Sequence, residues 1–195
     1  MRRVAIECQN LRLTKGTGIA TYARTLASEL RALNCSPIGL VGLSGPLDEH
    51  DSVLAEAQFF QPEESRERQS GWPSGYALQR FLSDPLGAKA KRVKLPGAVV
   101  DSEQWNKQFD QLYGLTHLDE RARNHLKTYG KLLAIKNIEH VDVFHATQAI
   151  AINMPRVPNL CTIHDIIPLR LPYATLTDTR YFFKLISAIV KPADR

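Results

Sequence analysis

Apolar positions along the chain alternate between short runs that suit buried strands and longer stretches at helical spacing. Apolar and β-branched residues dominate 3–8 and 38–43, which predicts two buried strands. The residues between them recur every three or four positions, as on one face of a helix: Ile19, Tyr22, Ala23, Leu26, Leu30 and Leu33. Thr17 or Gly18 can cap this helix at its start. A strand, a helix and a strand within about 40 residues form a βαβ unit, which requires a parallel sheet.

The last third of the chain repeats the α/β pattern. It predicts strands at 141–145 and 159–163, separated by Pro155 and Pro158. Thr177 or Asp178 can cap a closing helix, whose apolar face contains Tyr181, Phe182, Leu185, Ile186 and Ile189. The predicted fold class is therefore α/β: a Rossmann-like, three-layer domain with a mostly parallel sheet, incomplete at its C-terminus.

The middle of the chain, about 44–137, shows weaker periodicity and is predicted to be an irregular, partly helical insert with one short helix near Leu54. Two further helices are predicted between 102 and 137. The first has a face made of Trp105, Phe109, Leu112 and Tyr113. The second has a face made of Leu126, Tyr129, Leu132, Leu133 and Ile135.

Size and composition indicate one globular domain that spans residues 1–195, with 44% apolar and 23% charged residues. The sequence contains no run of about 18 apolar residues, so no transmembrane helix is predicted. Glu7 and Asn10 interrupt the first apolar run, which argues against a signal peptide, so we expect a cytoplasmic protein. The three cysteines are far apart in sequence, which argues against a disulfide framework or a zinc site. Cys8 and Cys161 lie in apolar runs and are predicted to be buried free thiols.

The chain has a formal net charge of +5, and part of the excess is local. Four basic residues lie within 88–95, namely Lys89, Lys91, Arg92 and Lys94. Such a run is most often a solvated loop, but it can also contact anionic lipid headgroups or phosphorylated substrates. The stretch is thus a candidate peripheral contact with the inner membrane face. No nucleic-acid-binding motif accompanies the charge, so no nucleic-acid partner is expected.

Two short motifs have residue types suited to ligand chemistry. The loop from Lys15 to Ile19 places two glycines before a helix start, where free N–H groups and the helix dipole favour a phosphate. It lacks the third glycine of a dinucleotide fingerprint, and the second strand ends without an acid for a ribose hydroxyl. His164 and Asp165 follow a predicted strand, at the sheet edge where α/β proteins bind ligands. His145 ends another strand and can converge on the same crevice.

Three segments together resemble the N-terminal domain of family-4 glycosyltransferases of the GT-B fold. Residues 16–30 (GTGIATYARTLASEL) resemble the family's glycine-rich loop and G-I-x-x-Y-x-x-x-L helix. Residues 141–146 (VDVFHA) resemble D-[LV]-[FV]-H-[AS], and residues 162–169 (TIHDIIPL) resemble T-I-H-D-L-x-P. The closing residues 193–195 resemble the start of a further family strand. The matches cover about a third of the chain and occur in the family's order.

The resemblance implies a hexosyltransferase that moves a sugar from a nucleotide-sugar to a glycan or lipid-linked acceptor, with retention and without a metal or other cofactor, as in polysaccharide biosynthesis. His164 would face the transferred sugar or acceptor as the candidate catalytic residue, and Asp165 would orient it. Gly16, Thr17 and Gly18 would approach the donor diphosphate. Lys15, His145 and Thr147 would line the acceptor cleft. The donor-binding C-terminal domain, with its E-x7-E motif, is absent from this sequence, so the truncated domain alone is expected to be inactive.

Two alternatives remain open at this stage. The first is a binding-only domain that has the same fold and no catalysis. The second is a dinucleotide-dependent oxidoreductase, which the missing third glycine and the missing acid disfavour. Fold alone does not decide among these functions.

Overall fold

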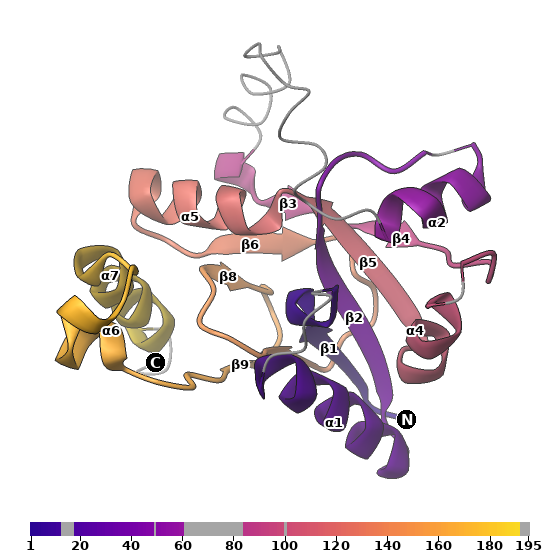
Figure 1. The fold of residues 1–195 in the computed structure, drawn as a ribbon, viewed down its shortest axis with the longest axis horizontal. Coiled ribbons are helices and arrows are strands. Elements are labelled where there is room, and N and C mark those ends of the chain that lie inside the picture. The colour runs from indigo at the N-terminus through magenta and orange to yellow at the C-terminus, as the bar shows by residue number, and fades with distance from the viewer. Residues whose placement is uncertain (13–17, 49, 61–83, 100, 192–195) are drawn as a thin grey trace.

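The chain forms a mixed α/β domain built on a mostly parallel six-stranded sheet (Figure 1). This arrangement is seen in a computed structural model that describes residues 1–12, 18–48, 50–60, 84–99 and 101–191. In spatial order, the strands of the sheet are β4 (Lys91–Val93), β5 (Gln111–Thr116), β2 (Ser36–Leu43), β1 (Arg3–Glu7), β7 (Val143–Ala146) and β9 (Asn159–Cys161). All neighbouring pairs are parallel except β4 with β5. The predicted α/β class, a Rossmann-like three-layer domain, is confirmed.

A second, smaller sheet is fully parallel. Its strands, in spatial order, are β3 (Ala88–Lys89), β6 (Leu133–Lys136) and β8 (Ile152–Asn153). Because β3 and β4 are separated by Ala90 alone, the chain passes from one sheet to the other at that residue.

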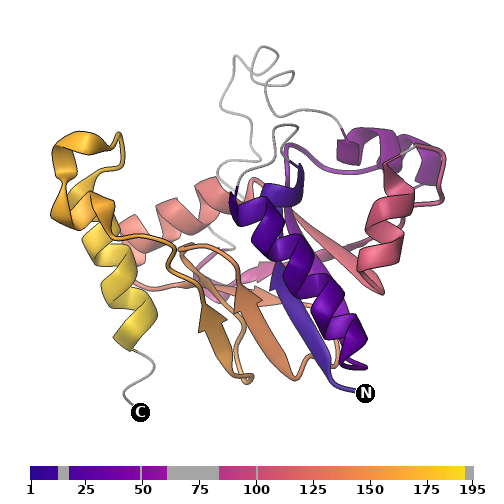
Figure 2. The same cartoon turned by 60° about the horizontal axis from the view of Figure 1, so that its bottom comes forward.

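The predicted N-terminal βαβ unit is present as β1, α1 (Gly18–Ala32) and β2, with a 3-10 turn at Gln9–Arg12 between β1 and α1. Helix α1 buries the small side chains Ala20, Ala23 and Ala27, which allow a helix to lie close to a sheet. Asn34 ends the helix in the left-handed region, with φ of 57°. The amide of Cys35 donates to the carbonyl of Leu30 at 2.8 Å, the bond that marks a Schellman cap. Figure 2 shows α1 lying along one face of the sheet.

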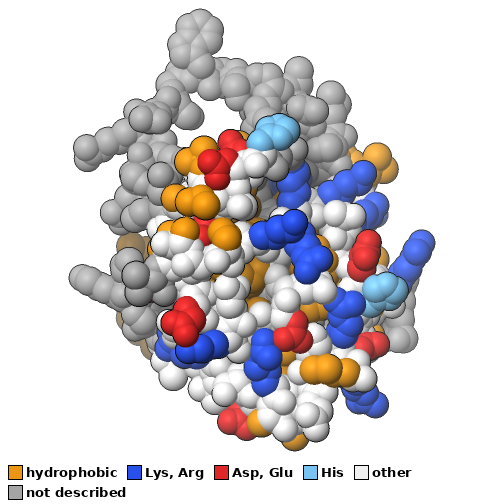
Figure 3. Space-filling model, turned by 90° about the vertical axis from the view of Figure 1, so that its right-hand side faces the viewer, with side chains coloured by type: hydrophobic (Ala, Val, Ile, Leu, Met, Phe, Trp, Pro, Cys, Tyr) orange, Lys and Arg blue, Asp and Glu red, His pale blue; other side chains and the backbone are white. Residues whose placement is uncertain are grey.

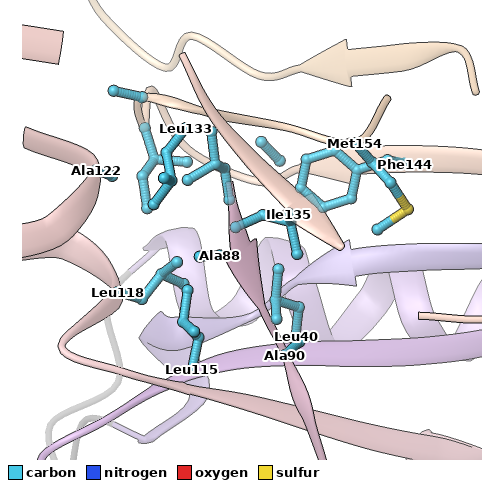
Figure 4. Packing of buried hydrophobic residues seen from close by; sticks show 14 of the residues in the cluster. Leu40, Ala88, Ala90, Leu115, Leu118, Ala122, Leu133, Ile135, Phe144 and Met154 are labelled. Atoms are coloured by element: carbon cyan, nitrogen blue, oxygen red, sulfur yellow. The ribbon is translucent and has the colours of Figure 1, made fainter. Parts of the chain in front are cut away.

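The main sheet buries a different core on each face. One core includes Ile6, Val41, Phe59, Trp105 and Leu112, and it lies on the α1 side with α2 (Ser52–Phe60) and α4 (Ser102–Gln108). The opposite core joins alternate residues of the same strands to α5 (Leu118–Tyr129), to the small sheet and to α7 (Thr179–Val190). Figure 4 shows part of this second core, in which Leu40, Leu115, Leu133, Ile135 and Phe144 pack together. The alternation of side chains along each strand therefore decides which core a residue joins.

The prediction that 44–137 is an irregular or helical insert is wrong. This segment contains β5, which pairs with β2 across six residues and occupies an interior position of the main sheet. The predicted helix through Trp105, Phe109, Leu112 and Tyr113 ends at Gln108, and Leu112 and Tyr113 lie on β5. Phe109 has an extended backbone and caps α4, so the helical spacing of these four residues is coincidental.

The second predicted helix is also shorter than its apolar pattern. Helix α5 ends at Tyr129 because Gly130 adopts a left-handed conformation with φ of 67° and caps it. Leu133 and Ile135 then lie on β6, where both are buried and Ala134 between them is half-buried. A spacing of two explains that burial better than a helical spacing. The short helix predicted near Leu54 is confirmed as α2.

The basic stretch forms ordered strands rather than a solvated loop. Ala88 and Ala90 are buried, and the amide of Ala90 donates to the carbonyl of Lys136 at 2.9 Å. The four basic residues of the stretch are exposed. A 3-10 turn at Asp84–Leu86 precedes the first of these strands.

The C-terminal segment after β9 consists of α6 (Ile167–Arg170), a 3-10 turn at Pro172–Ala174 and α7. The predicted cap of the closing helix is confirmed at Asp178, whose side chain accepts hydrogen bonds from the amides of Arg180 and Tyr181. Cys8 is a buried free thiol as predicted, whereas Cys161 is only half-buried. Among the described residues, no helix is long and apolar enough to cross a membrane.

Candidate functional site

Three parallel strands bring polar side chains to one edge of the main sheet. The last residue of β1, Glu7, is in register with Ala146 of β7, which is in register with Cys161 of β9. The residues at and just beyond this line stand at the carboxyl ends of the strands, where α/β proteins place their ligands. The topology of the sheet therefore determines where the candidate site lies.

His145 faces α1 because its two strand neighbours, Phe144 and Ala146, belong to the core on the other side of the sheet. Its Nε2 atom lies 2.9 Å from the hydroxyl of Thr162. The hydroxyl of Tyr22, from α1, lies 3.0 Å from that Thr162 hydroxyl and 3.5 Å from Nε2 of His145. Three elements thus meet in one polar cluster.

Burial lowers the pKa of His145 below its usual value. A half-buried imidazole has less water to solvate a positive charge, which favours the neutral ring. A neutral His145 has one nitrogen that donates and one that accepts, so it can exchange a hydrogen bond with a hydroxyl.

His164 joins the same cluster from the chain that follows β9. Its ring lies edge-on to the ring of Tyr22, with 5.4 Å between the ring centres. Its Nε2 atom lies 2.8 Å from the carbonyl oxygen of Thr147, and a carbonyl only accepts hydrogen bonds, so Nε2 must bear the proton. In the neutral ring Nδ1 is then the acceptor. Because His164 is exposed, that nitrogen is available to a ligand hydroxyl.

A buried carboxyl group, that of Glu7, helps to hold Thr147 and through it His164. Glu7 is fully buried, and its Oε1 accepts a hydrogen bond from the amide of Gln9 at 2.8 Å. The Thr147 hydroxyl lies 2.9 Å from the Glu7 carbonyl oxygen and 3.2 Å from its Oε2 atom. Burial raises the pKa of Glu7 to about 7. Glu7 therefore holds Thr147, whose carbonyl in turn holds His164.

The structure brings together His145, His164 and the backbone of Thr147, all of which the sequence singles out. Thr147 differs from the expectation in one respect: its side chain is fully buried against β1, so it contributes its carbonyl, and not its hydroxyl, to the exposed edge. Asp165 accepts a hydrogen bond from the amide of Ile167 at 3.0 Å, which caps the turn into α6. That contact matches a turn-capping role for Asp165.

The predicted diphosphate loop lies mostly outside the described residues. Lys15, Gly16 and Thr17 belong to that undescribed part, whereas Gly18 is the first residue of α1. Tyr22, one turn further along α1, contacts both histidines. The described start of the helix is therefore at the same sheet edge as His145 and His164.

Sequence reasoning missed three members of the site: Tyr22, Thr162 and Glu7. The sequence pattern places Tyr22 on the apolar face of its helix, although its hydroxyl gives it a polar end. Glu7 is an acidic residue inside an apolar strand, and such a residue signals a buried carboxyl group that needs partners. Within the described ranges, no group of three or more His, Cys, Asp or Glu side chains is arranged to hold a metal ion.

The chain has no significant match to any protein-family model, to any curated protein or to any solved structure.

Proposed function

We propose that this chain is the acceptor-side domain of a retaining glycosyltransferase that takes its sugar from a nucleotide-sugar and gives it to a glycan or lipid-linked acceptor. The observation that supports this most strongly is that the three segments that resemble the family converge. Tyr22 comes from the first segment, His145 from the second, and Thr162 and His164 from the third, and hydrogen-bond and ring contacts link all four. Segments separated by more than a hundred residues have thus become one site.

The chemistry of the cluster suits the recognition of sugar hydroxyls. His164 has a fixed tautomer, an exposed ring and an Nδ1 lone pair that can accept a hydrogen bond from a hydroxyl. His145, Thr162 and Tyr22 supply neutral groups that both donate and accept. Charged groups are not needed for such a task, because a sugar hydroxyl is itself neutral. In the proposed enzyme His164 contacts the transferred sugar or the acceptor, and we assign no protein nucleophile.

The test is sugar transfer by the full gene product that contains this chain, with His164→Ala as the variant. Loss of a positioned imidazole should lower turnover by about 100-fold, while the melting temperature stays close to that of the wild type because the residue is exposed. His140→Asn is the matched control, since His140 is exposed and precedes β7, at the opposite edge of the sheet. Asparagine tolerates the left-handed backbone found there, with φ of 53°.

Unchanged turnover in His164→Ala would remove this residue from the site. A gene product that binds glycan but transfers no sugar from any nucleotide-sugar would instead identify a binding-only domain.

A further inference from the structure

A pocket with a volume of about 520 Å³ lies at the opposite end of the same sheet edge from the histidine cluster. It is bordered by the carboxyl ends of β2 and β5, at Leu43 and Thr116, and by the first turn of α2 at Ser52. The strand pair β3 and β4 forms another wall. Figure 3 shows the face of the molecule that carries α2, β4 and α4, where many Lys and Arg side chains gather.

Basic residues dominate the polar part of the lining. Among the described residues that line the pocket are five cations, Lys89, Lys91, Arg92, Lys94 and Arg121, and one carboxylate, that of Asp48. That carboxylate is already engaged, because its Oδ1 accepts hydrogen bonds from the amides of Asp51 at 2.7 Å and His50 at 2.8 Å. These bonds lower the pKa of Asp48, so it remains ionised at neutral pH. Within the described lining, five cations thus face one acid.

The packing of strands β3 and β4 determines where these basic side chains lie. The buried residues Ala88, Ala90 and Val93 anchor the stretch, and the basic residues among them are left exposed. Strand β4 is then fixed antiparallel to β5, with Lys91 opposite Gly114 and Arg92 opposite Tyr113. Both cations border the pocket, which lies along β4, the strand at one edge of the sheet. Holding like charges together costs free energy, and an anionic ligand would remove that cost.

We propose that this pocket binds a phosphoryl group of a small phosphorylated molecule or of a phospholipid headgroup. Ammonium and guanidinium groups are the usual ligands of phosphate oxygens, through short charge-assisted hydrogen bonds. The volume exceeds that of a bare phosphate and falls in the range of small-molecule sites. The apolar side chains of Leu43, Leu47 and Val93 also line it, so the ligand carries an uncharged part beside its phosphate. The site stands whether or not the protein transfers sugars.

The first experiment measures binding of pyrophosphate to the whole chain by calorimetry. The pocket variant is Lys89→Gln with Arg92→Gln, and affinity should fall by about 100-fold, since each of the two lost contacts to a charged group is worth about tenfold or more. The matched control is Arg2→Gln with Lys131→Gln, which removes the same net charge from exposed residues outside the pocket. The control should bind as the wild type does.

A second pair of variants separates a pocket from a flat basic surface. Ser52→Trp narrows the pocket without a change of charge, because Ser52 is exposed and lines it. Val53→Trp adds the same side chain at the next residue, which is exposed and does not line it. Only the first variant should weaken pyrophosphate binding.

Vesicle sedimentation distinguishes the two sources of phosphate. Vesicles of phosphatidylcholine with and without phosphatidic acid are compared for the wild type, the pocket variant and the charge control. If the wild type sediments with vesicles that contain phosphatidic acid but not with pure phosphatidylcholine vesicles, and the pocket variant sediments with neither, the ligand is a lipid headgroup. If pyrophosphate binds and the vesicles do not, it is a soluble phosphate compound. Equal binding by pocket variant and control, or no binding of either probe by the wild type, would overturn the proposal.

Discussion

Glu7 is the residue whose environment has the clearest consequence for stability. Its carboxyl group is fully buried at the end of β1, and burial raises its pKa from 4.5 to about 7. The folded chain therefore keeps this proton at a pH where the unfolded chain has already lost it. The stability contributed by the group is fully present below pH 4.5, falls as the pH rises towards 7, and stays low above that value.

Replacement of Glu7 by Gln should remove this pH dependence, since the amide cannot ionise and nearly matches the carboxyl group in shape. Relative to the wild type, Glu7→Gln should gain stability between pH 5 and pH 8, by up to about 3 kcal/mol. Urea unfolding at both pH values measures the difference. Glu139→Gln, at an exposed acid, serves as the control and should show little change. A pH-independent difference between Glu7→Gln and the wild type would mean that Glu7 is ionised throughout.

Gly39 occupies a position on β2 where a side chain does not fit. A Cβ atom there would lie 2.6 Å from Cδ2 of Leu112 and 3.2 Å from Sγ of Cys8 and from Cδ1 of Phe109. All three neighbours are buried, so none can move into solvent. Gly39→Ala should therefore lower the free energy of unfolding by about 1–3 kcal/mol, as overpacking does in other cores.

The control for Gly39→Ala is Gly18→Ala, because nothing lies within 4 Å of a Cβ at Gly18. Thermal unfolding of the two variants separates the steric effect from the general effect of replacing glycine. If Gly39→Ala were as stable as the wild type, the packing between β2 and β5 would be looser than the structure indicates.

At the scale of elements, the stability of α7 depends on the hydrogen bonds made by its N-cap residue, Asp178. Asp178 has an extended backbone, and its Oδ1 accepts hydrogen bonds from the amides of Arg180 at 2.8 Å and Tyr181 at 3.2 Å. Asp178→Ala removes the acceptor of both hydrogen bonds and should lower the free energy of unfolding by about 1 kcal/mol. Asp178→Asn keeps an oxygen in place and should cost much less. Denaturant unfolding monitored by circular dichroism measures both variants, and equal losses would show that charge, and not capping, stabilises the helix.

The elements that sequence analysis predicts well are those whose pattern has one interpretation. Buried apolar runs at 3–8 and 38–43 predict β1 and β2, and the spacing between them predicts α1. The prediction for the middle segment is wrong because an apolar run of five or six residues suits a strand and a helical turn equally well. Leu112 and Tyr113 lie on opposite faces of β5, in different cores, and periodicity cannot reveal two cores before the sheet is known.

The site shows the same division. Strand-end histidines can be predicted because parallel strands end at one edge, and His145 and His164 do meet there. Tyr22 and Thr162 could not be assigned, because their role depends on how close α1 lies to the sheet. That closeness follows from the alanines on the buried face of the helix. The sequence shows these alanines but does not show which residues they pack against.

At the scale of the whole molecule, two polar features share one sheet edge. The histidine cluster lies over β1, β7 and β9, and the basic pocket lies over β2, β4 and β5. The first offers neutral hydrogen-bonding groups and the second offers positive charge, so they suit different parts of a ligand or different ligands. Under the proposed function, a phosphorylated acceptor could contact both, with its hydroxyls at one and its phosphate at the other.

The proposed function also predicts how this chain by itself should treat nucleotide-sugars. The family that the sequence resembles binds the base and ribose on the other domain, so only the diphosphate should find partners here. Amide hydrogen bonds at the start of α1 contribute about 1 kcal/mol each and must offset several kcal/mol of lost rigid-body freedom. The dissociation constant should therefore be about 1 mM or weaker. Titration calorimetry with UDP-, GDP- and ADP-linked sugars should give similar values for all three, none of them tighter than pyrophosphate. Repeating the titrations with Lys89→Gln and Arg92→Gln removes any diphosphate contact at the basic pocket. Tight binding that depends on the base would place the nucleotide site within these 195 residues and would contradict the assignment to the acceptor side.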